Sequence, residues 1–359
     1  MTRPPRPAAR MSEEPVMVLP PAIRETPPEG VGRRSLLLGT AAWCAVAAGC
    51  SPGTQASPAP RRATPAEAAR APVSPAPSAG LPAAVPWRPG PGEIEPAVKL
   101  AAVRLVEALG TWPPGQGGPR NAAQRAAALG IARPLAARLA AEAGPLTPPA
   151  DQAVVRVIDA QYGGLLPDTA SVLIPCAQTT RTGGVVRQGG TTVDVRLDRT
   201  PGGWAVTALH PGRPGPAAPL GASARAVLAQ PRIELPPDSA ADIRSGAVHE
   251  SVLRAMLRLA EKYRVSVSVV RSGHPLNVFG TSRPSDHPVG RAFDVWGIDG
   301  HPVVDPATPR RLITAFMRSA AAAGSYNVGG PVRLSGGATP NQFFSDDTHH
   351  DHVHVGFTG

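Results

Sequence analysis

The segment Ser285-Asp286-His287-Pro288-Val289-Gly290-Arg291-Ala292-Phe293-Asp294 contains a histidine and an aspartate separated by a turn of small residues. If a loop supplies His287 and the following strand supplies Asp294, both side chains can converge on one metal ion. Gly290 and Ala292 are small, which permits a tight loop and a close approach of the backbone beside these side chains. The segment therefore predicts a loop-then-strand unit that holds two metal ligands.

A second segment, His352-Val353-His354, lies near the end of the chain. Residues two apart in a strand point to the same face, so one of these histidines can ligate a zinc ion while the other stands beside the water at its open position. This combination predicts a hydrolase. Two simpler interpretations stay open: His287 and Asp294 could form a helix-cap or loop hydrogen-bond pair, and residues 349–352 could be a surface metal-scavenging tract.

Working outward, a strand expected over 265–270 ends in Arg271-Ser272-Gly273. The order of this arginine, the Ser-x-His-x-x-Gly-x-Ala-x-Asp segment and the final His-x-His resembles the zinc D-Ala-D-Ala carboxypeptidases. It is also similar to the wider group that includes VanY-type peptidases, murein endopeptidases and the hedgehog signalling domain. The resemblance covers about residues 233–359 and implies an α+β fold of the zinc D,D-peptidase kind for that part.

The resemblance also implies roles for individual residues. Zn²⁺ is the expected cofactor, with His287, Asp294 and His354 as its ligands. His352 is then expected to orient the water or to stabilise the oxyanion. In the VanY and VanX branch a glutamate three residues before the last ligand is the general base; here Asp351 holds that position. His352 and Asp351 are therefore both candidates for the base, and His352 is preferred.

Five further residues of this region receive expectations. By the same resemblance, Arg271 neutralises negative charge on the substrate or transition state, with a structural salt bridge as the alternative. Ser285 and Asp286 are expected to orient the ligand loop rather than to take part in the chemistry. His274 and His301 are expected to be solvated loop histidines.

The first fifty residues are typical of an export signal. Arg33-Arg34 precede an apolar run over 36–48 that is too short for a permanent membrane-spanning helix. The two arginines resemble a twin-arginine signal, and Cys50 lies where a lipoprotein signal peptidase would leave a lipidated cysteine. We expect a lipoprotein anchored to the outer face of the cell membrane, with ordinary secretion or a retained anchor as alternatives.

Composition narrows the partners. The formal net charge is +10, carried almost entirely by arginine because Lys99 and Lys262 are the only lysines. The arginines are scattered without an aromatic stacking pattern, which argues against nucleic acid. For an exported protein the acidic cell wall or anionic lipid are the expected neighbours, but the simpler interpretation, that the arginines reflect codon bias and serve solubility, stays open. If Cys44 leaves with the signal and Cys50 carries lipid, Cys176 alone remains, so stability must come from packing or from a metal.

Beyond the signal region and the tether, the chain is expected to form an α+β protein of two domains. Residues 1–50 are the signal region, 51–92 a Pro/Ala-rich disordered tether, 93–212 the first domain, 213–232 a linker and 233–359 the second domain. The second domain is expected to contain a helix over 241–264.

The first domain shows a helical period and then a strand period. Helices are expected from 93 and over 121–142, followed by strands at 154–158, 171–174 and 191–197 and a last one from Trp204. Glycine pairs at 183–184 and 189–190 and the segment 201–203 are expected turns. Helices cupped by a curved antiparallel sheet resemble the cone-shaped domains similar to nuclear transport factor 2, and a spacer role is favoured. The apolar stripe of the first helix comprises Ile94, Val98, Ala101, Leu105 and Leu109.

Together these features predict an exported, monomeric zinc peptidase that acts on peptidoglycan stem peptides. It would be a D-Ala-D-Ala carboxypeptidase or a D,D-/L,D-endopeptidase. The alternative is a catalytically silent, zinc-stabilised module that binds cell wall or a protein partner, since the hedgehog branch shows that the same ligands need not imply hydrolysis.

Overall fold

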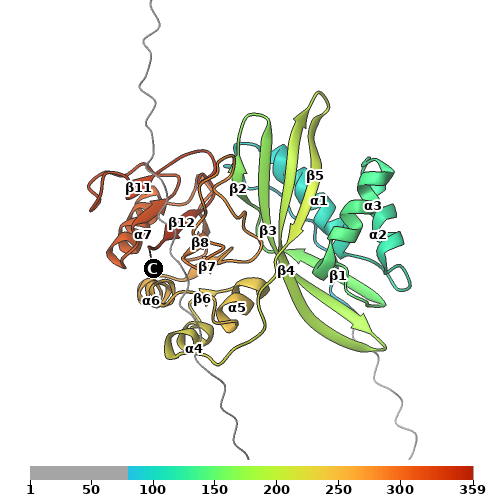
Figure 1. Cartoon of the computed structure of the whole chain (residues 1–359), viewed down its shortest axis with the longest axis horizontal. Helices are drawn as coiled ribbons and strands as arrows, with labels where there is room; N and C mark the ends of the chain where they lie inside the picture. The colour runs from blue at the N-terminus through green and yellow to red at the C-terminus, as the bar shows by residue number, and fades with distance from the viewer. Residues whose placement is uncertain (1–79, 359) are drawn as a thin grey trace, which may run out of the picture. The chain divides into compact units, whose positions relative to one another are not determined.

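The computed structural model describes residues 80–358, which belong to one compact unit, Pro72–Gly359. This part of the chain is a mixed α+β fold with two sheets (Figure 1). The twin arginines, Cys50 and residues 51–79 of the expected tether lie outside the described residues. Between residues 80 and 358, the fold contains no helix that is long and apolar enough to cross a membrane.

The first sheet is antiparallel, with strand order β1-β3-β4-β5 and with β2 paired to β3. The long β3–β4 hairpin turns at Gly183 and Gly184, as the sequence predicts. The glycine pair at 189–190 was expected to be a second turn, which is wrong, because both residues lie inside β4 and pair with β3. The strands are β1 (Gln152–Val157), β2 (Gln161–Leu165), β3 (Thr169–Thr182), β4 (Val185–Thr200) and β5 (Gly203–Pro211).

Helix α1 (Pro96–Gly110) lies against this sheet (Figure 1), and Val98, Leu105 and Leu109 of the predicted apolar stripe are buried. It begins at Pro96 because a proline suits the first helical position, and Ile94 of the predicted stripe therefore lies outside the helix and is exposed. The helix expected over 121–142 is two helices, α2 (Pro119–Ala127) and α3 (Arg133–Glu142), interrupted at Gly130 with φ 86°. A short 3₁₀ helix, Gly144–Leu146, follows.

The end of the expected tether is part of the fold. Residues 80–92 form no helix or strand, but Trp87 packs against the core of the first sheet. Its backbone N–H donates to Glu107 Oε1 at 2.7 Å. The prediction that 51–92 is a disordered tether is therefore wrong for its last residues, because a single tryptophan buries enough apolar surface to fix the chain.

The second sheet has strand order β11-β10-β12-β8-β7-β6, with β9 paired to β8. Its centre is the antiparallel pair β8–β12, and the expected strand at 265–270 ends earlier, at Val267. The strands are β6 (Ile233–Glu234), β7 (Val265–Val267), β8 (Ala292–Ile298), β9 (His301–Pro302), β10 (Asn327–Gly329), β11 (Phe343–Phe344) and β12 (Val353–Gly356).

Four helices accompany this sheet among the described residues: α4 (Ala222–Ala229), α5 (Pro237–Arg244), α6 (Glu250–Ala260) and α7 (Arg310–Ala322). Residues 213–232 are more than the expected linker, because α4 buries Ala224 and Val227 in the core beside α6. The helix expected over 241–264 is split into α5 and α6, with Gly246 at φ 74° between them.

The alternation of residues along β8 and β12 gives the second sheet two different faces. Phe293, Val295 and Val355 belong to the apolar core of this sheet. Asp294 and His354 alternate with them and therefore project from the opposite face. The two residues are direct partners in the β8–β12 register, so the pairing of these strands alone brings their side chains together.

Candidate metal centre

Three donor atoms converge where the loop before β8 meets the β8–β12 pair. His287 Nε2 lies 3.2 Å from Asp294 Oδ1 and 3.2 Å from His354 Nδ1, and His354 Nδ1 lies 3.1 Å from Asp294 Oδ1. His287 and Asp294 are at most 1% exposed and His354 is 9% exposed. The expectation that a loop supplies the histidine and the following strand the aspartate describes this arrangement.

The loop that carries His287 is held by a glycine, as expected. Gly290 has φ 73°, and a Cβ at this position would lie 1.9 Å from the carbonyl oxygen of Ala247. The N–H of Gly290 donates to the carbonyl of His287, and the carbonyl of Gly290 accepts from the N–H of His249. A side chain at Gly290 would therefore displace the turn that presents His287.

The protonation of His287 is fixed by its other ring nitrogen. His287 Nδ1 donates to the carbonyl of Val270 at 2.8 Å, so the neutral ring carries its lone pair on Nε2. That lone pair faces Asp294 Oδ1, which is also an acceptor. Two lone-pair atoms 3.2 Å apart can both bind one cation that lies to the side of the line joining them, and a backbone carbonyl behind a ligating histidine is the usual support of a metal site.

The charge states of Asp294 and His354 also suit a cation. Burial opposes ionisation of Asp294, but the neighbouring His287 and His352 hold its pKa well below the usual range. Burial lowers the pKa of His354 to about 4, so this ring is neutral at pH 7. The site therefore offers one carboxylate and the neutral imidazole of His354, next to Nε2 of His287.

This donor set fits zinc. Zinc bonds of about 2.0 to 2.2 Å in tetrahedral geometry place neighbouring donors roughly 3.3 to 3.6 Å apart, within a few tenths of an ångström of the three separations observed here. Three protein ligands of His and Asp type leave the fourth position open.

His274 is a competing donor, because its ring nitrogens come within 4.8 Å of those of His287 and of the Asp294 carboxylate. Its ring stacks on that of His287, with centroids 4.0 Å apart and an interplanar angle of 10°. Imidazoles that bind one tetrahedral ion diverge from it, so the stacked ring fits a supporting neighbour better than a ligand. The closer and non-parallel His354 is the better third donor.

The expectation that His274 is solvated is wrong. Burial and the adjacent His287 hold its pKa well below its ordinary value. Its Nδ1 lies 2.9 Å from the carbonyl of Pro275. His301 is exposed, as expected.

His352 is placed beside the three donors by its neighbour. Its Nδ1 donates to Asp351 Oδ1 at 2.6 Å, which leaves the lone pair of the neutral ring on Nε2, 3.9 Å from Asp294 Oδ2. Burial disfavours the charged ring, but the carboxylates of Asp294 and Asp351 outweigh burial and raise the pKa of His352. His352 can therefore accept and hold a proton next to the donor set.

Asp351 has no free oxygen directed at the donors. Its Oδ1 accepts from His352, and its Oδ2 accepts from the backbone N–H of Tyr162 at 2.9 Å and lies 2.6 Å from Lys99 Nζ. Burial would raise its pKa, but Lys99 lowers it below the ordinary value. Of the two candidates, His352 has a ring nitrogen that faces the Asp294 carboxylate, whereas both oxygens of Asp351 are engaged elsewhere.

Arg271 does not point its guanidinium at the three donors. Its Nε donates to the carbonyl of Pro288 at 3.1 Å, and one terminal nitrogen lies 3.6 Å from Asp242 Oδ1. Asp242 also accepts from the backbone and hydroxyl of Ser272. Arg271 thus forms a salt bridge with Asp242, which is the alternative role considered from the sequence. Its bond to Pro288 also supports the loop directly after His287.

Ser285 and Asp286 directly precede His287 in the same loop. The Ser285 hydroxyl lies 3.4 Å from the backbone N–H of His287 and 3.4 Å from His274 Nδ1. Asp286 Oδ2 accepts from the Tyr326 hydroxyl at 2.7 Å. Both contacts hold the loop, as expected of residues that orient it.

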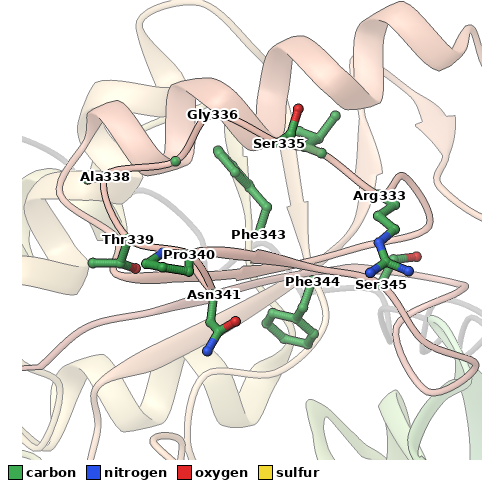
Figure 2. A pocket seen from close by; sticks show the side chains of 12 residues that line it. Arg333, Ser335, Gly336, Ala338, Thr339, Pro340, Asn341, Phe343, Phe344 and Ser345 are labelled. Carbon is green, nitrogen blue, oxygen red and sulfur yellow. The ribbon is translucent and has the colours of Figure 1, made fainter.

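Two cavities lie on the described part of the chain, and His287, Asp294 and His354 line neither of them. One, of about 700 Å³, lies between the loop 273–281 and strands β3 to β5 and reaches His274. The other, of about 640 Å³, is lined by residues 333–345 (Figure 2). Figure 2 shows the rings of Phe343 and Phe344 on opposite sides of β11, and the Phe344 ring lies 4.6 Å from that of His349, which in turn lies 5.8 Å from His354.

Sequence reasoning missed the residues that the first sheet and helix α1 contribute. Gln161 Nε2 donates to Asp294 Oδ2 at 2.6 Å, and Lys99 lies against Asp351. Nothing in the pattern around Gln161 indicated this role. The scarcity of lysine could have drawn attention to Lys99, since a lysine among the buried residues of an apolar helix needs a partner.

Comparisons of this chain with models of protein families, with curated proteins and with solved structures found no match. The functional assignment therefore depends on the geometry of the site.

Proposed function

We propose that this chain is an exported, zinc-dependent peptidase that acts on peptidoglycan stem peptides. It would be a D-Ala-D-Ala carboxypeptidase or a D,D-/L,D-endopeptidase. The observation that supports this most is the convergence of His287 Nε2, Asp294 Oδ1 and His354 Nδ1 at 3.1–3.2 Å, with His352 beside them. The accompanying fold proposal is a zinc D,D-peptidase-like region over 233–359 and a cone-like region, similar to nuclear transport factor 2, over 93–212.

The chemistry divides between the bound ion and the residues around it. Zinc supplies a Lewis acid that polarises a carbonyl and lowers the pKa of a water molecule to about 7. His287, Asp294 and His354 would hold it. His352 would accept at Nε2 the proton that the attacking water loses and give it to the amine nitrogen released when the peptide C–N bond breaks, because Asp351 keeps its Nδ1 protonated and its ring oriented.

The location and partners are part of the same proposal. A lipidated Cys50 would anchor the chain to the outer face of the membrane, where peptidoglycan peptides are available. We propose that the chain acts there as a monomer and does not bind nucleic acid.

A second candidate function is favoured by the deep burial of the site. His287, Asp294 and His352 are at most 2% exposed, which would also suit a zinc ion that only stabilises the fold. Such a module would bind cell wall or a protein partner without hydrolysis.

The experiment begins with the metal. Full-length protein and His354→Ala are dialysed against zinc and the bound metal is measured, with His301→Ala as the control because His301 is an exposed histidine outside the donor set. One equivalent of zinc is expected in wild type and in the control, and a strong loss in His354→Ala. Retention of a full equivalent by His354→Ala would show that the ligand set is wrong.

The zinc-loaded protein is then incubated with muropeptides that carry pentapeptide stems or cross-links, and the products are identified by mass spectrometry. Zinc-dependent loss of terminal D-Ala, or separation of cross-linked stems, is expected. His352→Gln should keep the metal and lose cleavage by roughly 10²- to 10⁴-fold, the contribution usual for a general base. Full zinc occupancy with no cleavage in wild type would favour the binding module.

A further inference from the structure

We propose that the first sheet and α1 complete the metal centre, with Gln161 positioning Asp294 and with Lys99 positioning Asp351 and, through it, His352. This inference rests on the proposed function because it assigns roles toward the same zinc ion. It replaces the spacer role expected for residues 93–212.

Gln161 is fixed at both ends of its amide. Its Nε2 donates to Asp294 Oδ2 at 2.6 Å, and its Oε1 accepts from the Ser268 hydroxyl. Because Oδ2 of Asp294 is engaged by this donor, Oδ1 is the oxygen left facing His287 and His354. The amide therefore selects which oxygen of Asp294 is presented and fixes the rotation of its carboxylate.

Strand β2, which carries Gln161, is hydrogen-bonded to the segment 348–351, which precedes His352. The backbone N–H of Tyr162 donates to Asp351 Oδ2 at 2.9 Å, and that of Leu165 donates to the Thr348 hydroxyl at 3.1 Å. In the first sheet β2 pairs only with β3, so these N–H groups would lack a strand partner on their other side. The edge of the sheet is thus satisfied by the residues that lead into the site.

Lys99 supplies the positive charge that keeps the buried carboxylate of Asp351 ionised. Its Nζ lies 2.6 Å from Asp351 Oδ2 and 2.5 Å from Glu93 Oε2, and its side chain is 1% exposed. A buried carboxylate without a cation would take up a proton and could no longer accept from His352 Nδ1. Lys99 therefore acts on His352 through Asp351.

These contacts join residues from distant parts of the sequence into one supporting layer behind the donors. Partners that support metal ligands in this way typically change metal affinity by about 10- to 100-fold when they are removed. The prediction is that a change at Gln161, which would touch neither the metal nor the substrate, weakens zinc binding by such a factor.

The test compares two buried glutamines of the first sheet in the full-length chain. Gln161→Met removes the donor to Asp294 at nearly constant volume. Gln178→Met is the matched control, because Gln178 is also buried and donates to the carbonyls of Gly110 and Leu146, away from the donors. Zinc affinity is measured by competition with a chelator, and the visible spectrum of the Co²⁺-loaded protein reports the geometry of the ligands.

Gln161→Met is expected to bind zinc about 10- to 100-fold more weakly than wild type and to show an altered Co²⁺ spectrum. Gln178→Met should lose stability but retain wild-type affinity and spectrum. Equal zinc affinity and equal spectra in the two variants would overturn the positioning role. Failure of the wild type itself to bind zinc would instead overturn the proposed function.

If Gln161→Met does not fold, Ser268→Ala makes a smaller change to the same amide, since it removes only the hydroxyl that holds Gln161 Oε1. Ser268→Ala is expected to weaken zinc binding less than the factor predicted for Gln161→Met, and to change the Co²⁺ spectrum in the same direction as that variant. Wild-type affinity and spectrum in Ser268→Ala would contradict the proposal.

Discussion

The ammonium of Lys99 lies 2.6 Å from Asp351 Oδ2, with both side chains at most 2% exposed. Lys99 belongs to α1 beside the first sheet, whereas Asp351 directly precedes His352 and β12 of the second sheet. Burial alone would depress the pKa of Lys99, but Asp351 and Glu93 outweigh burial and raise it, so the lysine is charged. The pair therefore links α1 and the first sheet to the histidine-containing segment that leads into β12.

Lys99→Met should lower the free energy of unfolding by about 3 to 5 kcal/mol, because it leaves the carboxylates of Glu93 and Asp351 buried without a cation. Urea unfolding at pH 7 measures this. Lys262→Met is the control, since Lys262 is the other lysine of the chain and is exposed; its effect should stay within about 0.5 kcal/mol. Equal unfolding midpoints for the two variants would refute the importance of the buried pair.

Gly290→Ala should destabilise the protein more than Gly300→Ala. Both glycines have positive φ, at 73° and 82°, so both substitutions carry the backbone strain of about 1 to 2 kcal/mol. Only at Gly290 would the new Cβ also meet an atom, the carbonyl oxygen of Ala247 at 1.9 Å, whereas no heavy atom lies within 4 Å of a Cβ at Gly300.

Thermal unfolding and zinc affinity should both be measured for the two glycine variants. A lower melting temperature and weaker zinc binding are expected for Gly290→Ala relative to Gly300→Ala. The idea that this turn presents His287 fails if Gly290→Ala binds zinc as tightly as Gly300→Ala does.

Asp238 should give the stability of the protein a distinctive pH dependence. Its Oδ2 accepts from Thr191 Oγ1 at 2.9 Å and from the Thr192 N–H at 2.8 Å, and burial raises its pKa to about 6. Between pH 4 and 6 the folded protein therefore binds more proton at this group than the unfolded chain, so its contribution to stability falls as pH rises.

Compared with Asp238→Asn, wild type should lose up to about 3 kcal/mol of unfolding free energy as pH rises from about 4 to about 6. The difference should then stay level toward pH 8. Urea unfolding of both proteins across this range measures the difference. A difference that is constant, or that grows in favour of wild type with rising pH, would be inconsistent with a raised pKa.

Arg271→Ala separates the two roles considered for this residue. If Arg271 supports the loop through Pro288 and Asp242, the variant should bind zinc several-fold more weakly and lose about 1 kcal/mol of stability. Arg254→Ala, which breaks an exposed ion pair within α6, should change neither quantity appreciably. Unchanged zinc affinity with a raised KM for peptide would instead identify Arg271 as a substrate contact.

Much of the local structure could be predicted, because local periodicity and turn chemistry are written in consecutive residues. The burial of Val98, Leu105 and Leu109 along α1, the β3–β4 turn at Gly183 and the tight turn at Gly290 all follow from such signals. The errors occurred where tertiary packing outweighs local preference. Gly190 remains in a strand because β3 pairs with it, and α4 forms in an expected linker because its apolar face has a core to cover.

The sequence by itself determined the types of donor and their placement on a loop and two strands, because residue spacing fixes which side chains share a face of a strand. Only the tertiary structure decided which of them meet. The β8–β12 register sets Asp294 opposite His354, whereas Gln161 reaches the site from β2 of the first sheet and Lys99 from helix α1. No local pattern records such contacts, because they depend on how two sheets far apart in sequence bury their polar groups against each other.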